Sequence, residues 1–413
     1  MTTRKRYDLH INTAHTGRVL AAECVLEEEG GSLRRAAFRY RPDYLAMDGA
    51  FALDPVALPL APGERLLRCT GGMPGIVDDY LPDAWGGKVL ARLAWYQDRR
   101  KLNANSAIDM LALAGHSRVG ALCMVPAGDA PAWEPGVSLD LLDRIEGAAQ
   151  HIDDADLSEM DTEAMSLLYL ADAGAGVGGA RPKALVHDGS QAWLAKFNRL
   201  GADAYNNARV ELACLNMARD IGIRVAEGHI RSGINGREVL LLERFDMAAD
   251  DARHHLISAN ALLKSQSTQA DQGGAFRYDD IAELLRRHSP DIIADLDQLI
   301  RLMLFNRAIN NLDDHERNFS LVWSGEGYRF APAYDLVPSL VQGGYPVAGF
   351  GYSPFPPRPS ELLAGRKTLG LSAPKVRAAA EEVMGVVNRW PEYAAAAGVD
   401  EQDAELVARF FCP

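Results

Sequence analysis

Alternating apolar and polar positions predict short strands within the first 125 residues of the chain. Residues 18–26 and 36–40 alternate in this way on either side of a Glu-Gly-Gly-Ser turn, which is typical of a β-hairpin. Residues 81–93 and 106–114 predict two helices, and the apolar run at 119–126 predicts a buried strand. This part of the chain is therefore expected to mix strands and helices.

Strand patterns also dominate the next part of the chain, from about residue 165 to residue 246. An Asp-Gly pair at 188–189 predicts a hairpin turn into a strand at 191–197, and two more strands are expected before residue 246. One helix is predicted over 206–220, because its apolar residues fall at helical spacing: Val210, Cys214, Met217, Ala218 and Ile221.

Helical patterns predominate after residue 250. The apolar stripe of one predicted helix comprises Leu296, Leu299, Ile300, Met303, Leu304 and Ala308. A short hairpin is expected between Phe319 and Phe330. These patterns predict an α+β fold with an N-terminal accessory subdomain over 1–130, a strand-rich lobe over 131–246 and a helical lobe over 247–413.

Composition and charge narrow the class of protein. The formal net charge of -13 argues against a protein that coats nucleic acid by bulk charge, because such contacts rely on clustered Lys and Arg. The five cysteines are scattered and form no Cys-x-x-Cys pair, so neither a disulfide framework nor a cysteine zinc site is expected. No window approaches the roughly 20 apolar residues of a membrane helix, and the basic start lacks the apolar stretch of a signal peptide. We expect a cytoplasmic protein that does not contact a membrane.

Polar residues crowd both ends of the hairpin at 319–330. Asp313 and Asn318 precede it and Asp335 follows it. Because a hairpin brings its two ends together, we expect these three side chains to lie close to one another. Magnesium prefers oxygen ligands and takes few of them from the protein at phosphate sites. Asn318 and Asp335 would bind Mg²⁺, and Asp313 would orient a hydroxyl and accept its proton.

The spacing of this cluster matches a kinase catalytic loop, in which an Asp is followed five positions later by an Asn. The alternative without a catalytic role is that these residues are solvated turn residues, since Asp and Asn favour turns. Metal-dependent or serine hydrolysis is not expected, because the chain has neither a His-Glu-x-x-His motif nor a Gly-x-Ser-x-Gly elbow.

The strand-rich lobe offers groups that could hold a nucleotide. Lys196 interrupts an apolar strand and could contact phosphates, with Glu211 on the next helix as its partner. The alternatives are that Lys196 protects a sheet edge and that Glu211 is a surface residue. The glycine-rich stretch at 173–183 could approach phosphate or be an ordinary loop. Residues 243–246 could meet an adenine ring or simply end a strand.

These residues together resemble the HipA family of bacterial toxins. The resemblance extends over most of the chain, because residues 81–85 and 119–122 also resemble the N-terminal region of that family. The family has an Asn-x-Asp-x-His-x-Lys-Asn-x-Ser loop, a Tyr-Asp pair, a Gly-Ala-x-x-Lys loop and an Arg-Phe-Asp hinge. The matching positions here are Asn311, Asp313, His315, Arg317, Asn318 and Ser320, then Tyr334 and Asp335, then Gly179, Ala180 and Lys183, and finally Arg244, Phe245 and Asp246.

The resemblance implies a two-lobed, protein-kinase-like fold with a strand-rich N-terminal region and an all-helical C-terminal lobe. It implies an ATP- and Mg²⁺-dependent serine/threonine protein kinase in which Asp313 is the catalytic base and Asn318 and Asp335 bind the metal. The groups implied to contact the nucleotide are Lys196, His315, Gly179, Lys183, Glu211 and the backbones of Glu243 and Phe245.

Partners also follow from the resemblance. HipA-like toxins are held by a small DNA-binding antitoxin, HipB-like, so DNA would be reached only through that partner. Known protein substrates of the family include aminoacyl-tRNA synthetases. The same spacing of Asp and Asn also suits a small-molecule phosphotransferase, which is the second possibility. The third possibility is a non-catalytic nucleotide-binding component of a repressor complex.

Overall fold

The computed structural model describes residues 2–69, 72–114, 118–150, 152, 165, 166, 168, 181–189, 191–199, 201, 203–236, 238–264 and 276–413. The chain forms two compact units, and each combines segments that are distant in sequence. Unit 1 comprises Met1–Arg199, Ser232–Arg237 and Glu243–Gln272, and unit 2 comprises Leu200–Arg231, Glu238–Leu242 and Gly273–Pro413. These units cut across the three segments expected from the sequence, whose boundaries stay a prediction.

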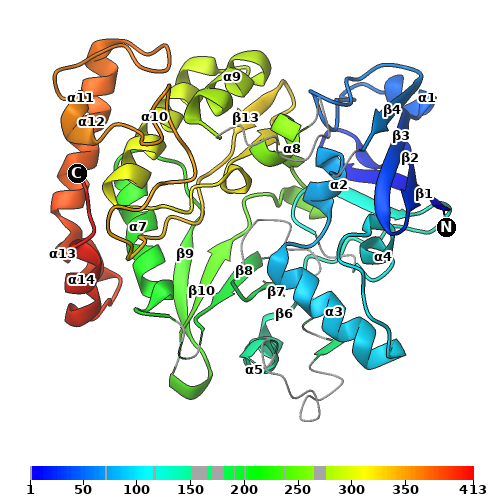
Figure 1. Ribbon diagram of the computed structural model, residues 1–413, viewed down its shortest axis with the longest axis horizontal. Coiled ribbons are helices and arrows are strands. Elements are labelled where there is room, and N and C mark those ends of the chain that lie inside the picture. Colours follow the sequence, from blue (N-terminus) through cyan, green and yellow to red (C-terminus); the bar gives the residue numbers. More distant parts are fainter. Residues whose placement is uncertain are drawn as a thin grey trace. The chain divides into compact units, whose positions relative to one another are not determined.

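An antiparallel five-stranded sheet in the order β4-β3-β2-β1-β5 begins unit 1 (Figure 1). Its strands are β1 (Thr2–Thr13), β2 (Gly17–Glu29), β3 (Ser32–Tyr40), β4 (Glu64–Arg68) and β5 (Leu122–Pro126). Tyr7 lies opposite Cys24, which lies opposite Phe38, and all three side chains are buried. One face of the sheet is therefore apolar, as the alternation in β2 and β3 predicts.

The rest of unit 1 adds short helices and a second group of strands. The helices are α1 (Pro42–Leu45), α2 (Gly75–Tyr80), α3 (Ala84–Asp98), α4 (Ala107–Leu111), α5 (Leu142–Gln150) and α8 (Ala259–Lys264). The strands are β6 (Val137–Ser138), β7 (Lys183–Asp188), β8 (Gln191–Phe197) and β11 (Leu256–Ser258). The hairpin predicted at the Asp-Gly pair is confirmed, since β7 and β8 pair antiparallel on either side of it.

Unit 2 is mainly helical (Figure 1). Its helices are α7 (Asn207–Asp220), α9 (Tyr278–His288), α10 (Ile292–Ala308), α11 (Pro359–Leu362), α12 (Ala373–Asn388), α13 (Trp390–Ala396) and α14 (Glu401–Ala408). Its strands are β9 (Gly228–Ser232) and β10 (Glu238–Glu243), which are neighbours, and the hairpin β12 (Ser320–Trp323) and β13 (Tyr328–Phe330). The predicted hairpin is therefore confirmed.

Helix α10 lies at the centre of the packing in unit 2, against α9, α11 and α12. The six residues of its predicted apolar stripe are all buried. Burial of such a stripe, at about 25 cal/mol per Å² of apolar surface, holds the helix in place. The end of α10 therefore provides a fixed point from which the polar loop after it starts. Among the described residues, no helix is both long and apolar enough to span a membrane.

Candidate active site

The loop that follows α10 is attached to a later part of the chain by Asn310. Asn310 has a left-handed backbone conformation, with φ of 57°, which asparagine adopts more readily than most residues. Its Nδ2 atom donates hydrogen bonds to the carbonyl oxygens of Ser339, at 2.8 Å, and Val341, at 3.2 Å. The helix thus ends abruptly, and the loop begins beside the segment that follows Asp335.

Asn311 connects the two sides of the predicted site. Its Nδ2 atom donates to the Asn306 side chain and to the Asp335 carbonyl oxygen, each at 3.2 Å. Its Oδ1 atom accepts from the backbone N–H of Asp313, also at 3.2 Å. The buried amide of Asn311 therefore fixes the backbones of Asp313 and Asp335 relative to each other.

Asp313 presents its carboxylate to solvent. The side chain is 78% exposed, and its Oδ1 atom lies 3.9 Å from Nε2 of His315. A general base must come within hydrogen-bond reach of the proton that it accepts. An exposed carboxylate on a fixed backbone can be reached by a hydroxyl of another molecule, as the predicted role requires.

Tyr334 joins the two ends of the β12–β13 hairpin. Its hydroxyl donates to the Arg317 carbonyl at 3.0 Å and lies 2.7 Å from Oγ of Ser320. A tyrosine hydroxyl has one proton, so Ser320 must be the donor in the second hydrogen bond. The residue next to Asp335 is thereby held against the residues on either side of Asn318.

The Asn318 side chain has one amide atom engaged and the other without a partner. Its Nδ2 atom donates to the Asp313 carbonyl at 2.7 Å, while its buried Oδ1 atom has no hydrogen-bond partner among the described residues. Leaving a buried acceptor unsatisfied costs about 1–3 kcal/mol, and a hard cation such as Mg²⁺ would satisfy it. Asp335 has a left-handed backbone with φ of 54°, a strained conformation for a non-glycine residue, and such strain clusters at functional sites. Asn318 and Asp335 thus fit a magnesium site.

A buried hydrogen-bond network supports the loop from behind. Asp314 accepts from the Tyr278 hydroxyl at 2.8 Å and from the backbone N–H of Ala348 at 3.0 Å. Asn306 donates to the same Tyr278 hydroxyl at 3.0 Å and accepts from Asn311. Burial, partly offset by these hydrogen bonds, raises the pKa of Asp314 to about 7. The network positions the loop. Of the adjacent residues Asp313 and Asp314, only Asp313 faces outward.

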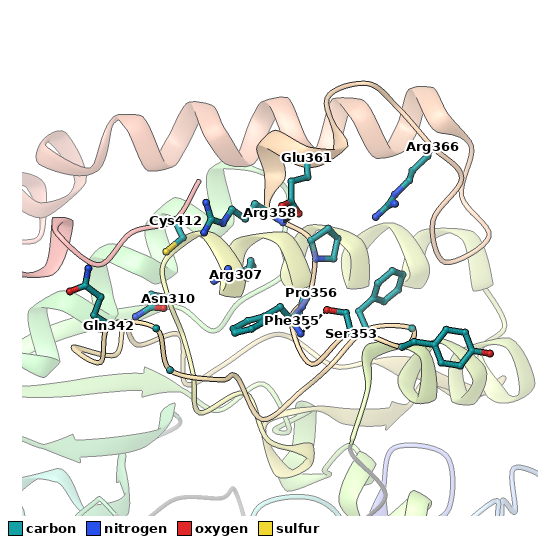
Figure 2. Close-up of a pocket in the computed structure, with 16 residues that line it drawn as sticks. Arg307, Asn310, Gln342, Ser353, Phe355, Pro356, Arg358, Glu361, Arg366 and Cys412 are labelled. Atoms are coloured by element: carbon teal, nitrogen blue, oxygen red, sulfur yellow. Dashed lines mark hydrogen bonds between the residues drawn. The ribbon is translucent and has the colours of Figure 1, made fainter.

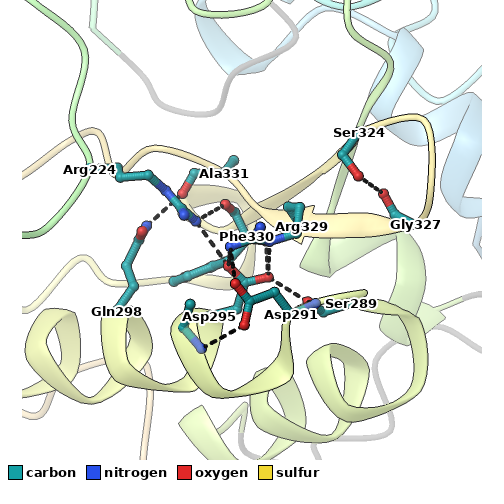
Figure 3. Close-up of polar contacts among 11 residues, drawn as sticks. Arg224, Ser289, Asp291, Asp295, Gln298, Ser324, Gly327, Arg329, Phe330 and Ala331 are labelled. Carbon is teal, nitrogen blue, oxygen red and sulfur yellow. Dashed lines mark hydrogen bonds and ion pairs between the residues drawn. The ribbon is translucent and has the colours of Figure 1, made fainter.

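A second network fixes the strand that leads to Asp335 (Figure 3). Asp295 of α10 is fully buried and accepts from Arg329 Nε at 2.9 Å and Arg224 Nη2 at 3.0 Å. It also accepts from Ser289 Oγ at 2.6 Å and the Phe330 N–H at 3.1 Å. Burial alone would raise the pKa of Asp295, but these hydrogen bonds outweigh it and lower the pKa.

Helix α10 holds the same strand at one further point. Gln298, one turn after Asp295, donates to the Ala331 carbonyl at 2.9 Å (Figure 3). The next residues are also tied down, since the N–H of Ala333 donates to the Arg224 carbonyl at 2.7 Å. The path of the chain into Asp335 is thus set by polar side chains on the buried face of α10.

The two lysines predicted to contact nucleotide are cross-strand neighbours in unit 1. Lys183 on β7 lies directly opposite Lys196 on β8, so both side chains leave the same face of the hairpin. Lys183 is buried, and its Nζ atom lies 2.5 Å from Oδ2 of Asp83, the N-cap residue of α3. The charge of Lys183 is therefore compensated within unit 1, and its contact with nucleotide stays a prediction.

The remaining predicted nucleotide residues are placed as follows. Gly179 lies outside the described residues. Glu211 is buried on α7 in unit 2. Glu243 is the last residue of β10, and it belongs to unit 1, as does Phe245 after it. The roles of these residues, like that of His315, stay predictions.

The Arg-Phe-Asp motif has a structural role that the sequence did not reveal. Arg244 and Asp246 form a buried ion pair at 2.6 Å, and Asp246 also accepts from the N–H of Gly120 at 2.7 Å. Burial would raise the pKa of Asp246, but the Arg244 charge and the hydrogen bonds lower it. The segment after Glu243 is thereby anchored to the loop before β5, within unit 1.

The sequence interpretation missed the residues that support the loops from behind. Asp295, Gln298 and Asn306 are polar residues on the buried side of an otherwise apolar helix. A polar side chain at such a position costs free energy unless it is hydrogen-bonded, so its presence signals a specific partner. That signal was available for α10, although it does not identify the partner.

Comparison with known proteins places the chain in a family. Residues 175–408 match the model of the HipA-like C-terminal domain, and residues 21–125 match the HipA N-terminal domain. A chain in the structure of the Shewanella oneidensis MR-1 toxin–antitoxin system, a complex of HipA, HipB and operator DNA, superposes with a TM-score of 0.66 at 18% identity. That alignment covers 98% of this chain and 94% of that one.

A curated relative is similar over a shorter stretch. The Putative kinase Y4mE of Sinorhizobium fredii is 33% identical over 136 residues, and the match spans 32% of this chain and 32% of that protein. The structural superposition supports the α+β fold predicted from the sequence, and both domain models match in the predicted order. The chain belongs to the HipA family.

Proposed function

We propose that this chain is an ATP-dependent serine/threonine protein kinase of the HipA toxin type, which transfers the γ-phosphate of ATP to a protein hydroxyl. The observation that carries the proposal is the Asn318 amide, whose nitrogen is engaged by the Asp313 carbonyl while its buried oxygen has no partner among the described residues. One amide thus connects the predicted base to the predicted metal position. A buried oxygen without a partner is uncommon in folded proteins, and a bound cation would account for this one.

Each residue has a defined part in the proposed reaction. Asn318 and Asp335 would hold Mg²⁺, which neutralises charge on the phosphates when bound with ATP. Asp313 would orient the acceptor hydroxyl. The hydroxyl oxygen bonds to the γ-phosphorus as the bond from that phosphorus to the bridging oxygen of ADP breaks, and Asp313 accepts the hydroxyl proton.

The proposed partner is a small DNA-binding antitoxin. The Shewanella structure contains HipA with HipB and operator DNA, which supports an equivalent partner for this chain. The net charge of -13 favours contact with DNA through that partner rather than through a basic track on this chain.

Radiolabelled ATP incubated with Mg²⁺, the full chain and a cell extract tests the proposal. Label on a protein supports it. Label found only on a small molecule would indicate a small-molecule phosphotransferase. ATP binding with no transferred label would indicate a nucleotide-binding component without catalysis.

Replacing Lys196 with alanine is expected to weaken ATP use. A hydrogen bond from a charged group contributes about 1.5–3 kcal/mol, so the KM for ATP should rise at least about 10-fold. The alternative, in which Lys196 protects an unpaired sheet edge, is less suitable. The Ala192 carbonyl of β8 accepts from the Arg244 N–H at 3.0 Å, so this strand has a backbone partner besides β7. The measurement is KM in the phosphoryl-transfer assay, with exposed Lys101→Ala as the matched control. An unchanged KM would remove Lys196 from the nucleotide site.

A further inference from the structure

A large cavity in unit 2 adjoins the predicted catalytic loop (Figure 2). Its volume is about 1100 Å³, above the roughly 300–1,000 Å³ of typical small-molecule sites. Most of its wall is formed by residues 342–358, which follow Asp335 in the chain. The cavity is therefore large enough for several residues of a peptide.

The cavity carries positive charge although the chain as a whole is acidic. Arg307, Arg358 and Arg366 line it, together with one carboxylate, that of Glu361 (Figure 2). Glu361 accepts a hydrogen bond from the backbone N–H of Arg358 at 3.0 Å, so its carboxylate is used at the start of α11. No ion pair is found for the three guanidinium groups within the described part of the chain. An arginine fork is suited to carboxylates and other oxyanions.

Arg307 is fixed in place as one wall of the cavity. Its guanidinium lies over the ring of Phe355, 5.2 Å from the ring centroid. Its Nε atom is buried and has no hydrogen-bond partner among the described residues. A stacked guanidinium still has its donors directed from the edge of the plane, so Arg307 is preorganised for an anionic group.

The position of the cavity connects it with the acceptor of the reaction. Asn310, three residues before Asp313, lines it and also holds Ser339 and Val341 by hydrogen bonds. The N–H of Val347 donates to the Leu312 carbonyl at 3.2 Å. The wall of the cavity and the catalytic loop are thus held together by hydrogen bonds.

Large apolar side chains are exposed on the same segment. Val341, Tyr345 and Tyr352 are 57%, 68% and 105% exposed, and Val347 is 44% exposed. Tyr345 stacks on Phe355 with ring centroids 4.8 Å apart, which joins this apolar surface to the cavity wall. Clustered exposed apolar residues beside a polar pocket are typical of a protein-binding surface.

We propose that this cavity binds an acidic segment of the protein substrate beside its acceptor hydroxyl. Carboxylates of the segment pair with Arg307, Arg358 and Arg366, and its apolar side chains cover the exposed tyrosines. This inference rests on the proposed kinase function, and it specifies the substrate class. The cavity size and the apolar rim favour a peptide segment over a small anion.

Fluorescence anisotropy without ATP tests this proposal on the full chain. The probe is a labelled peptide, Glu-Glu-Leu-Ser-Leu-Glu-Glu, and the comparison peptide has lysine in place of each glutamate. The acidic peptide is expected to bind at least about 10-fold more tightly, with an affinity that falls as salt rises. The double variant Arg358→Gln with Arg366→Gln should lose at least about 10-fold in affinity.

The controls separate this proposal from the kinase function. Arg377→Gln removes an exposed arginine of α12 that pairs with Glu381, and it should bind the peptide like the wild type. Equal binding of both peptides, or no effect of the double variant, would overturn the cavity proposal even if label from ATP appears on a protein. Tight, arginine-dependent binding without any transfer of label would overturn the kinase function and leave the cavity as a docking site.

Discussion

Replacing Asp313 with asparagine is expected to reduce phosphoryl transfer by about 10²-fold or more, because general-base catalysis typically contributes that amount. Asparagine keeps the shape of the side chain and removes its ability to accept the proton. The side chain is 78% exposed, so the free energy of unfolding should stay close to that of the wild type. The initial rate of label transfer and a thermal unfolding curve measure the two effects.

The control for this prediction comes from the same loop. Glu316 lies three residues after Asp313 and has no part in the proposed reaction, so Glu316→Gln should transfer label at the wild-type rate. If Asp313→Asn also retained a rate within a few-fold of the wild type, another group would have to accept the proton. A loss of rate that is accompanied by unfolding would instead reveal a structural role for Asp313.

The parts of the site that the sequence predicted are close together along the chain. Asp313, Asn318 and Asp335 are separated by one short hairpin, and a hairpin necessarily brings its ends together. Tyr334, which was noted only as part of a motif, turns out to join those ends through Ser320 and Arg317. The geometry of a hairpin was therefore enough to predict that the loop with Asp313 and Asn318 lies beside Asp335.

The missed contacts join residues that are far apart in sequence. Lys183 pairs with Asp83, 100 positions earlier, and Tyr278 donates to Asp314, 36 positions later. Neither spacing follows from helical or strand periodicity, because both depend on how separate elements pack. The resemblance to the Gly-Ala-x-x-Lys loop of the family implied that Lys183 contacts phosphate. It did not reveal that Asp83 is the partner of Lys183.

Strands were predictable where apolar and polar residues alternate regularly, and not where a run of charged residues interrupts that alternation. Strands β2 and β3 were predicted, whereas β1 was not. The first residues of β1, 2–6, are exposed and include a run of Arg4, Lys5 and Arg6. Only from Tyr7 onward do buried residues appear in this strand, and its pairing with both β2 and β5 provides the partners that define it.

Replacing Asp295 with alanine is expected to destabilise the protein strongly. The change leaves the guanidinium groups of Arg329 and Arg224 without their shared carboxylate and the Phe330 N–H without its acceptor. Removing one partner of a buried ion pair costs about 3–5 kcal/mol. Arg224 is 43% exposed and can be solvated, so we expect a value near the lower limit, about 3 kcal/mol.

The pH dependence of this loss follows from the direction of the pKa shift. The pKa of Asp295 is lowered from 3.8 in the folded protein, so its contribution is complete above about pH 4 and disappears as pH falls through the folded pKa. The difference in unfolding free energy between wild type and Asp295→Ala should therefore be constant near neutral pH and shrink below pH 4. Denaturant unfolding at several pH values measures it.

A surface carboxylate provides the matched control. Glu283 on α9 pairs with Arg286 and Arg287 in solvent, and Glu283→Ala should leave the unfolding free energy nearly unchanged, because exposed ion pairs contribute little. Since Asp295 holds the strand that leads to Asp335, the variant should also lose phosphoryl transfer under conditions where it remains folded. Full transfer by folded Asp295→Ala would show that the strand keeps Asp335 in place without the buried carboxylate, and the positioning role inferred for α10 would be wrong.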